Sequence, residues 1–257
     1  MAKHSKSIED YLKAIYVLER EEQIEVSSSA VATRLGVSAP AATTMLKKLA
    51  DRGLVRYERY RGVALTVDGA RAAVEVVRHH RLLEQYLSQR LDVAIDEVHD
   101  EAEQLEHALS EELEARIDRN LGFPTHDPHG DPIPDADLRV ADRPARTLIE
   151  LAPGEQAIVQ RVPDRDRELL RYLSGIGILP GTTVKVVAAE PFEGTLLVLA
   201  GDVQCAISSN LARLISVDER PRPPARPAPR GLPPAPPPSS CAPSRSRPRR
   251  RRSPPRR

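Results

Sequence analysis

Residues 29–66 of the chain read SAVATRLGVSAPAATTMLKKLADRGLVRYERYRGVALT. The first seven of these residues fit a short helix, and the Gly36-Val37 turn separates it from a second helix over residues 39–52. Ser38 is a suitable N-cap for that second helix, and Pro40 lies in its first turn, where proline is tolerated because the backbone N–H has no helical partner. This stretch therefore predicts a helix-turn-helix unit.

The segments on either side extend this unit. Upstream, apolar residues recur on one helical face at Ile8, Tyr11, Leu12, Ile15 and Leu18. Downstream, residues 54–60 and 63–66 fit two strands joined by a turn at Arg61-Gly62. Three helices followed by a β-hairpin predict a winged helix-turn-helix.

The rest of the chain predicts helices, then strands, then a tail. Long helices are expected over residues 68–90 and 95–120, and the Pro-, Asp- and Gly-rich residues 123–145 predict a linker or an ordered loop. A small five-stranded β-barrel with one short helix, residues 166–173, is expected to follow. Its strands are residues 156–162, 183–188, 196–199, 204–207 and 214–217. The last 40 residues are rich in Pro, Arg and Ser and are expected to be disordered.

Charge is distributed unevenly along the chain, although the net charge is only +1. Residues 218–257 hold 12 Arg and two acidic residues, which leaves 26 basic and 35 acidic residues in the rest. An acidic body is unusual for a DNA-binding protein unless part of the acid holds cations and the basic DNA surface is local. The Arg-rich tail either adds salt-sensitive DNA affinity or is a dispensable extension.

Composition also bears on location. No apolar run approaches the ~18 residues of a transmembrane helix, and the polar N-terminus has no signal-peptide core. Cys205 and Cys241 are far apart and do not suggest a disulfide framework. A cytoplasmic protein that does not contact membranes is expected.

The second helix of the helix-turn-helix predicts the DNA-reading surface, because its N-terminal end enters the major groove in this motif. Small hydroxyl and methyl side chains there suit contacts with thymine methyl groups and base edges. Sequence preference is then expected to depend on DNA shape and dimer spacing. The candidates are Ser38, Pro40, Ala41, Thr43 and Thr44 for bases, Lys47, Lys48 and Arg52 for phosphates, and Arg56, Arg59 and Arg61 on the wing. The alternative is a winged helix used for protein contacts.

Residues 99–107, HDEAEQLEH, predict metal chemistry. On a continuous helix, four donor side chains project from one stripe about 100° wide: His99, Glu103, Glu106 and His107. Such groups are unfavourable to bury on a packing face without a cation. On the preceding helix His80 and Glu84 stand four residues apart, so both can bind one ion. The alternative is a solvated acidic helix face.

These motifs in this order resemble the diphtheria toxin repressor family of metal-dependent repressors, over residues 1–217. The segments that carry the resemblance are SIEDYL at 7–12, RYRG at 59–62, HRLLE at 80–84, HDEAE at 99–103 and Glu106-His107. The resemblance implies a mainly α fold with β: a winged helix-turn-helix DNA-binding domain (1–70), a helical metal-binding and dimerisation domain with a Pro-rich linker (71–145), an SH3-like FeoA-type β-barrel (146–217) and a disordered tail (218–257). It also implies a homodimer that binds a palindromic operator in double-stranded DNA and represses genes of metal-ion homeostasis.

The resemblance further implies two metal positions per subunit. One has the ligands Asp10, Glu103, Glu106 and His107. The other has His80, Glu84 and His99, completed by a carboxylate of the SH3-like domain, for which the candidates are Asp164, Asp166 and Glu168. Iron-responsive members tend to have Met in place of Asp10 and Cys in place of Glu103. Because oxygen donors suit Mn²⁺, the chain resembles the manganese-responsive branch, with Fe²⁺ as the alternative.

Two residues of the first helix bear on this assignment. Asp10 is also placed to form a capping box with Ser7, a role compatible with metal binding only if its carboxylate turns inward. Lys13 stands where some manganese-responsive members have a second acidic ligand. Its positive charge disfavours a second cation nearby, so two separate sites are expected.

Other classes of function are alternatives. A di-metal carboxylate enzyme needs an open coordination position beside a substrate pocket and a base that is not a ligand; no such group stands out, so the chain is not expected to be an enzyme. A constitutive DNA-binding protein would carry an acidic helical domain without metal. The segment DPHGD at 127–131 suggests either a metal loop or a turn, and the turn is the preferred interpretation.

Overall fold

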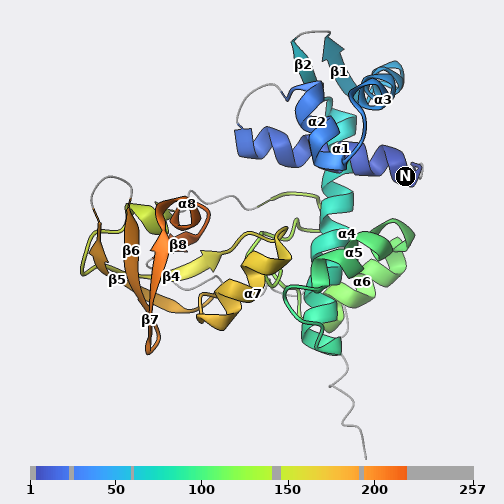
Figure 1. The fold of residues 1–257 in the computed structure, drawn as a ribbon. Helices are drawn as coiled ribbons and strands as arrows, with labels where there is room; N and C mark the ends of the chain where they lie inside the picture. The colour runs from blue at the N-terminus through green and yellow to red at the C-terminus, as the bar shows by residue number, and fades with distance from the viewer. Residues whose placement is uncertain (1–3, 23–25, 59–60, 141–145, 191–193, 219–257) are drawn as a thin grey trace, which may run out of the picture.

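The computed structural model describes residues 4–22, 26–58, 61–140, 146–190 and 194–218. Within them the chain forms a winged helix at one end, a helical unit below it and an antiparallel sheet unit beside the helices (Figure 1). Each unit has its own core of buried apolar side chains. The described helices include none that is long and apolar enough to cross a membrane.

The winged helix has the predicted order of elements. It consists of α1 (Lys6–Glu22), α2 (Ser28–Leu35), α3 (Ala39–Asp51), β1 (Val55–Glu58) and β2 (Gly62–Leu65). Ser38 caps α3 as predicted, since its Oγ accepts a hydrogen bond from the N–H of Ala41. The predicted capping box between Ser7 and Asp10 is not formed. Helix α1 begins at Lys6, so Ser7 already lies inside the helix, and the N–H of Ile8 donates to Ser5 O. The carboxylate of Asp10 is therefore not used as a cap.

Helix α4 (Val67–Leu91) belongs to two units at once. Ala73, Val74 and Val77 are part of the winged-helix core, whereas Leu82, Leu83 and Leu87 are part of the helical core. The start of α4 fits closely against the winged helix at Gly69, where a Cβ atom would lie only 1.8 Å from Leu54 O. A single rod thus joins the two units (Figure 1).

The second long helix is not continuous, which corrects the expected helix over residues 95–120. The chain forms α5 (Val98–Leu105), a 3₁₀ turn (Glu106–Ala108) and α6 (Glu111–Asn120). Leu109 adopts an extended backbone with ψ 131°, and Ser110 then caps α6 by accepting a hydrogen bond from the N–H of Leu113. A strong N-cap residue here starts a new helix rather than continuing the old one.

Residues 123–140 form an ordered loop that returns across α4 to the winged helix. Asp127 shapes its first part, because its Oδ1 accepts hydrogen bonds from the N–H groups of three following residues, each at 2.9 Å. Ile133 joins the helical core, and Leu138 and Val140 pack against the winged-helix core.

The C-terminal unit is a six-stranded antiparallel sheet in the order β3-β8-β4-β5-β6-β7. Its strands are β3 (Arg146–Thr147), β4 (Gln156–Arg161), β5 (Thr183–Ala189), β6 (Thr195–Ala200), β7 (Val203–Ser208) and β8 (Ser216–Asp218). The short helices are α7 (Arg167–Gly175) and α8 (Ser209–Ala212). Five of these strands were predicted, and β3 adds a sixth. It is only two residues long, too short for alternating polarity to reveal.

The sheet unit contacts the helical unit through α7 and through Val162, the first residue after β4. Arg171 Nε lies 2.6 Å from Asp96 Oδ2, and Arg167 lies 2.7 Å from Glu97 Oε1. In the backbone, the N–H of Val162 donates to His129 O at 2.9 Å. Figure 1 shows α7 between the strands of the sheet unit and α4. These contacts bring the segment after β4 next to α4 and α5.

Candidate metal centre and DNA-binding surface

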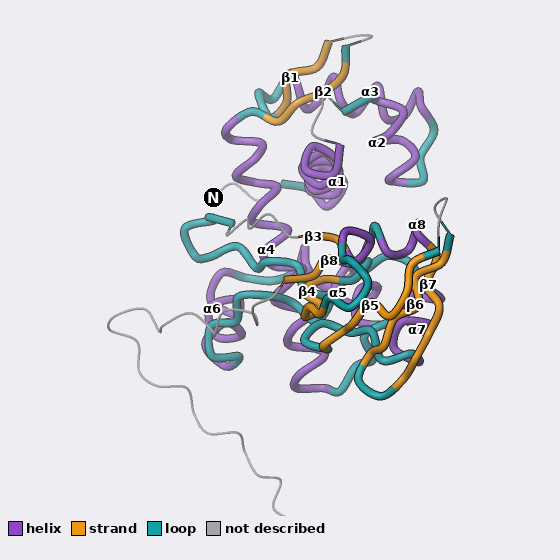
Figure 2. The backbone as a smooth tube through the Cα atoms, turned by 90° about the vertical axis from the view of Figure 1, so that its left-hand side faces the viewer, coloured by secondary structure: helices purple, strands orange, loops and turns teal. Residues whose placement is uncertain are grey.

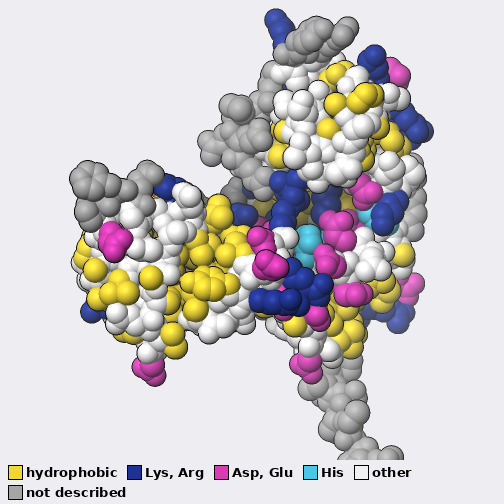
Figure 3. All heavy atoms as spheres, viewed as in Figure 1, with side chains coloured by type: hydrophobic (Ala, Val, Ile, Leu, Met, Phe, Trp, Pro, Cys, Tyr) yellow, Lys and Arg dark blue, Asp and Glu magenta, His cyan; other side chains and the backbone are white. Residues whose placement is uncertain are grey.

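Two clusters of carboxylates and imidazoles lie where α1, α4 and α5 meet. The Asp10 cluster comprises Asp10, Glu103, Glu106 and His107; the Glu84 cluster comprises His80, Glu84, His99, Asp127 and His129. Within these clusters, four overlapping groups of three residues have ligand atoms within 4.8 Å of one another. Charged side chains and a histidine gather on this face of the molecule (Figure 3).

In the Asp10 cluster, His107 faces the winged helix across the domain boundary. Its Nε2 lies 2.7 Å from Asp10 Oδ1 and 3.4 Å from Glu106 Oε1, whereas its Nδ1 lies 2.6 Å from Glu9 Oε2. Nε2 is buried and has no hydrogen-bond partner. A carboxylate on Nδ1 fixes the tautomer in which Nε2 presents a lone pair. This nitrogen therefore points into a space between two carboxylates, in the way that a metal-binding imidazole does.

Glu9 is a residue that the sequence interpretation missed. It precedes the predicted ligand Asp10, and the spacing of His107 gave no sign that this imidazole would need a partner on α1. Burial lowers the pKa of His107, but the nearby carboxylates of Asp10 and Glu9 outweigh burial and raise that pKa. The acidic groups around this imidazole thus favour a positive charge among them.

Lys13 fills the other side of the Asp10 cluster. Its Nζ lies 2.8 Å from Glu103 Oε1, 2.8 Å from Glu106 Oε2 and 3.1 Å from His80 Nδ1. The lysine side chain is only 11% exposed. Burial raises the pKa of Glu103, but the Lys13 charge lowers it to about 2. The predicted ligand Glu103 is thus held by an ammonium group.

The predicted stripe of four donors is therefore split in two, because α5 ends before Glu106. His99 turns toward Glu84, with 3.1 Å between its Nδ1 and Glu84 Oε1. Glu103 and Glu106 turn toward Lys13, and His107 turns toward Asp10. All four side chains still face the junction of α1 and α4, although the helix is not continuous.

The Glu84 cluster has a fully buried carboxylate at its centre. Glu84 Oε1 lies 2.9 Å from His80 Nε2, and the Glu84 side chain is 1% exposed. Burial raises the pKa of Glu84, but the charge of His80 and the nearby imidazoles of His129 and His99 lower it well below its ordinary value. Burial also lowers the pKa of His80, yet the Glu84 charge and the Glu106 hydrogen bond raise it to about 9. Glu84 remains an anion in the protein interior.

His129 completes this cluster, and here the preferred interpretation of residues 127–131 as a mere turn was incomplete. His129 is fully buried, and its Nε2 lies 2.9 Å from Ile95 O. Its Nδ1 has no hydrogen-bond partner and lies 3.8 Å from Glu84 Oε2. Asp127 is also buried in this group, so the segment is both a turn and part of a donor cluster. A histidine 45 residues after Glu84 carries no periodic signal.

The sheet unit supplies a carboxylate beside the Glu84 cluster. Burial and the Glu84 charge raise the pKa of Asp164, but the charges of His99 and His129 outweigh them and lower it. Of the other two candidates, Asp166 is used as the N-cap of α7, accepting from the N–H of Leu169, and Glu168 is exposed. Asp164 is therefore the acidic residue of this segment whose electrostatic surroundings are those of the cluster.

One imidazole joins the two clusters. His80 Nδ1 lies 2.5 Å from Glu106 Oε2, whereas His80 Nε2 lies 2.9 Å from Glu84 Oε1. The sequence assigned His80 to the second metal position only. Any movement of this ring at one cluster changes its distance to the other, so the clusters are mechanically coupled.

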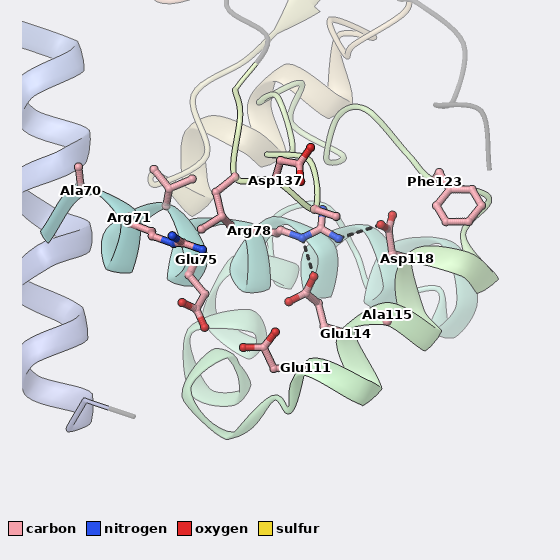
Figure 4. Close-up of a pocket in the computed structure, with 13 residues that line it drawn as sticks. Ala70, Arg71, Glu75, Arg78, Glu111, Glu114, Ala115, Asp118, Phe123 and Asp137 are labelled. Atoms are coloured by element: carbon pink, nitrogen blue, oxygen red, sulfur yellow. Dashed lines mark hydrogen bonds and ion pairs between the residues drawn. The ribbon is translucent and has the colours of Figure 1, made fainter. Parts of the chain in front are cut away.

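A separate ion-pair network holds α6 on α4. Arg78 points between Glu114 and Asp118, with 2.5 Å from its Nε to Glu114 Oε1 and 2.8 Å from its Nη2 to Asp118 Oδ2 (Figure 4). His79 Nε2 lies 2.9 Å from Glu114 Oε2. Burial raises the pKa of Glu114, but His79 and Arg78 lower it overall. Every charge here has an opposite partner, so this network is structural.

The predicted DNA-reading residues lie at the end of the molecule away from α5 and α6 (Figures 1 and 2). Most of those on α3 are exposed, and Thr43 is half-buried in a hollow between α2, α3 and the hairpin. Two hydroxyls are already engaged: Ser38 caps the helix, and Thr44 Oγ1 donates to Pro40 O at 2.9 Å. Arg61 is exposed and pairs with Glu58. Arg59 lies outside the described residues. The exposed candidates on α3 are Ser38, Pro40, Ala41, Thr44, Lys47 and Lys48.

Comparison with known proteins decides the family. Residues 3–63 match the N-terminal DNA-binding domain of iron-dependent repressors, residues 66–135 match the metal-binding and dimerisation domain of the same repressors, and residues 146–219 match the FeoA domain. The diphtheria toxin repressor of Corynebacterium diphtheriae is 36% identical over 221 residues, which cover 82% of this chain and 96% of that protein. The chain belongs to the iron-dependent repressor family. It is a metal-dependent, DNA-binding transcriptional repressor, not an enzyme, as the sequence predicted.

Relatives of this repressor include proteins named for iron and proteins named for manganese. The iron-dependent repressor IdeR of Mycobacterium leprae is 30% identical over 224 residues, covering 82% of this chain and 96% of that protein. A solved structure described as a manganese-dependent transcriptional repressor complex with manganese is 44% identical, with a TM-score of 0.77, and covers 83% of this chain and 100% of that one. The manganese regulator SloR is 32% identical with a TM-score of 0.69, covering 83% and 98%. The family match thus establishes metal dependence.

Proposed function

We propose that this repressor responds to manganese, and that Asp10, Glu103, Glu106 and His107 hold the regulatory ion. The observation that carries the proposal is the buried Nε2 of His107, which lacks a hydrogen-bond partner and lies 2.7 Å from Asp10 Oδ1. The donors around it are carboxylates and imidazoles, which suit Mn²⁺ better than softer metals. The 44% identity to a manganese-dependent repressor supports the same assignment.

The geometry of the Asp10 cluster suggests how metal controls DNA binding. Asp10 lies on α1 in the winged helix. Glu103 lies on α5, and Glu106 and His107 lie in the 3₁₀ turn after it, all within the metal-binding and dimerisation domain. A divalent cation supplies the positive charge that lets these acidic groups share one site. With that charge present, Asp10 adds a second link between α1 and the helical unit beside the Lys13 contacts. This link gives the two recognition helices of a homodimer the spacing of a palindromic operator. Coupling of this kind typically amounts to ~1–3 kcal/mol.

The Glu84 cluster is proposed as the second metal position. Its ligands are His80, Glu84 and His99 from the helical unit, with His129 from the loop after α6 and Asp164 from the sheet unit. Two observations support this set: the His129 Nδ1 without a partner, 3.8 Å from Glu84 Oε2, and the lowered pKa of Asp164. Since the donors come from four segments, one of them in the sheet unit, an ion here would fasten the sheet unit to the helices.

Several further features complete the proposal. The domain boundaries are taken at residues 70, 145 and 217. The recognition surface is α3 with the wing, including Arg59, and the protein acts in the cytoplasm as a homodimer that represses metal-uptake genes. An iron-responsive repressor with the same architecture is the second candidate, favoured by the 36% identity to a diphtheria toxin repressor over almost all of that protein.

The test is operator binding measured against titrated Mn²⁺, Fe²⁺, Co²⁺ and Zn²⁺. Asp10→Ala and Glu103→Ala are expected to abolish metal-stimulated binding while the protein stays folded. Glu101→Ala is the matched control, because Glu101 lies on the exposed face of the same helix, α5. Variants at Asp10 and Glu103 that respond to Mn²⁺ like the parent would contradict the site, and stimulation by Fe²⁺ at far lower concentration than Mn²⁺ would contradict the metal.

A further inference from the structure

Lys13 occupies a position that is built for a cation. Its Nζ has contacts of 2.8 Å to Glu103 Oε1, 2.8 Å and 3.1 Å to the two oxygens of Glu106, and 3.1 Å to His80 Nδ1. Those three partners are themselves one of the groups whose ligand atoms lie within 4.8 Å of one another. The lysine is buried and comes from α1, whereas its partners come from α4, α5 and the 3₁₀ turn that follows α5. A side-chain ammonium therefore fills a metal-sized space.

This arrangement links the same two units that the Asp10 cluster links. Asp10 and Lys13 are three residues apart on α1, so their side chains lie on one face of the helix. Asp10 faces His107, and Lys13 faces Glu103 and Glu106. Charge-assisted hydrogen bonds of this length are among the strong ones in proteins. Before any metal binds, Lys13 already connects α1 to the helical unit.

We propose that Lys13 is a tethered cation that holds α1 against the helical unit in the metal-free repressor and competes with metal for Glu103 and Glu106, so that the Asp10 cluster takes a single metal ion. The second half of this proposal rests on the proposed function, whereas the first half does not. A divalent ion bound about 5 Å from an ammonium group is repelled by it, and Coulomb's law with the dielectric constant of water gives at least about a tenfold weaker affinity. Lys13 thereby sets the metal concentration at which the repressor responds.

The test compares Lys13→Met with the parent in the full-length chain. Methionine keeps the length of the side chain and removes its charge. Lys6→Met is the matched control, because Lys6 lies on the same helix and is exposed. In chelator, Lys13→Met is expected to lower the unfolding temperature by several degrees while Lys6→Met leaves it unchanged. Adding Glu103→Gln to Lys13→Met should recover part of the loss, because one unpaired carboxylate is then removed.

Manganese titration tests the competition. Lys13→Met is expected to bind Mn²⁺ at the Asp10 cluster at least about tenfold more tightly than the parent. Lys13→Glu is expected to take up one additional Mn²⁺ ion per subunit, with spin coupling between neighbouring ions in the electron paramagnetic resonance spectrum.

The two halves fail separately. If Lys13→Met is as stable as the parent in chelator, Lys13 does not hold α1 against the helical unit. If Lys13→Met binds Mn²⁺ equally or more weakly than the parent, Lys13 does not compete with the metal. A parent protein that binds no Mn²⁺ refutes the proposed function and the competition together, while the chelator measurement still decides whether Lys13 holds α1.

Discussion

Replacing Gly69 with alanine is expected to loosen the joint between the winged helix and α4. A Cβ atom at this position would lie 1.8 Å from Leu54 O and 2.8 Å from Leu54 C, so the backbone of Leu54 must move by more than an ångström to reach ordinary contact. Overpacking of this kind typically destabilises by ~1–3 kcal/mol.

Hydrogen bonds at the same carbonyl add to the effect. Leu54 O accepts from the N–H of Thr66 at 3.1 Å and from Thr66 Oγ1 at 3.0 Å. Losing them contributes roughly 1 kcal/mol each. The better helix propensity of alanine offsets up to about 1 kcal/mol. The expected net loss is therefore about 2–4 kcal/mol.

Native-state hydrogen exchange of the full chain measures this effect, because it separates local opening of the winged helix from global unfolding. Gly69→Ala should accelerate exchange of the protected amides of α1 and α3 and leave those of the sheet unit unchanged. Gly175→Ala is the control: it lies in the last turn of α7, and a Cβ atom there meets nothing within 4 Å. If Gly69→Ala protects the winged helix as well as the parent does, the close approach to Leu54 is not a real constraint.

Three further changes probe the units around the clusters. His129→Ala should weaken Mn²⁺ binding at the Glu84 cluster about 10–100-fold, as loss of a metal-site imidazole does, and leave the Asp10 cluster unchanged; identical calorimetric titrations of variant and parent would show that His129 does not contribute. Arg167→Ala with Arg171→Ala should reduce docking of the sheet unit by only a few fold, because their side chains are 45% and 58% exposed and such pairs are worth ~0.2–1 kcal/mol each. Small-angle scattering at low and high salt measures how compact the protein is, and Arg116→Ala is the control. A double variant that is as compact and as salt-sensitive as the parent would contradict a role for the two arginines in docking. Glu114→Gln should destabilise by about 1–3 kcal/mol at pH 7, and because the folded pKa of Glu114 is lowered, the difference from the parent should shrink as the pH falls below about 4.5 through that pKa; a difference independent of pH in acid unfolding would exclude the ion pairs as its cause.

The fold could be predicted where local signals and packing agree. The Ser38 cap and the turns of the winged helix are local signals, so their positions followed from the sequence, whereas the predicted cap at Ser7 did not form. The break between α5 and α6 could not be seen in the same way, because EAEQLE at 101–106 consists of good helix formers. Only Ser110 marks a new start, and a serine within a polar stretch is a common residue.

The candidate site could be predicted in part for a similar reason. Donors spaced by three or four residues on one helix, such as His80 and Glu84, carry a periodic signal. Glu9, Lys13 and His129 enter the clusters through contacts between segments far apart in the chain, and no spacing encodes those contacts. Asp164 could be proposed only through resemblance, and the structure then distinguishes it from Asp166, which caps α7.

The continuity of α4 has a consequence for the size of the movements involved. A straight helix of 25 residues is about 37 Å long at 1.5 Å per residue. His80 lies near the middle of this lever, 13 residues or about 20 Å from its start at Val67. A tilt of about 5° about His80 displaces the start of α4 by roughly 1.7 Å, about half of the 3.4 Å rise between successive base pairs of DNA. Sub-ångström adjustments among buried carboxylates are therefore enough to move a reading helix out of step with its half-site by about half a base pair.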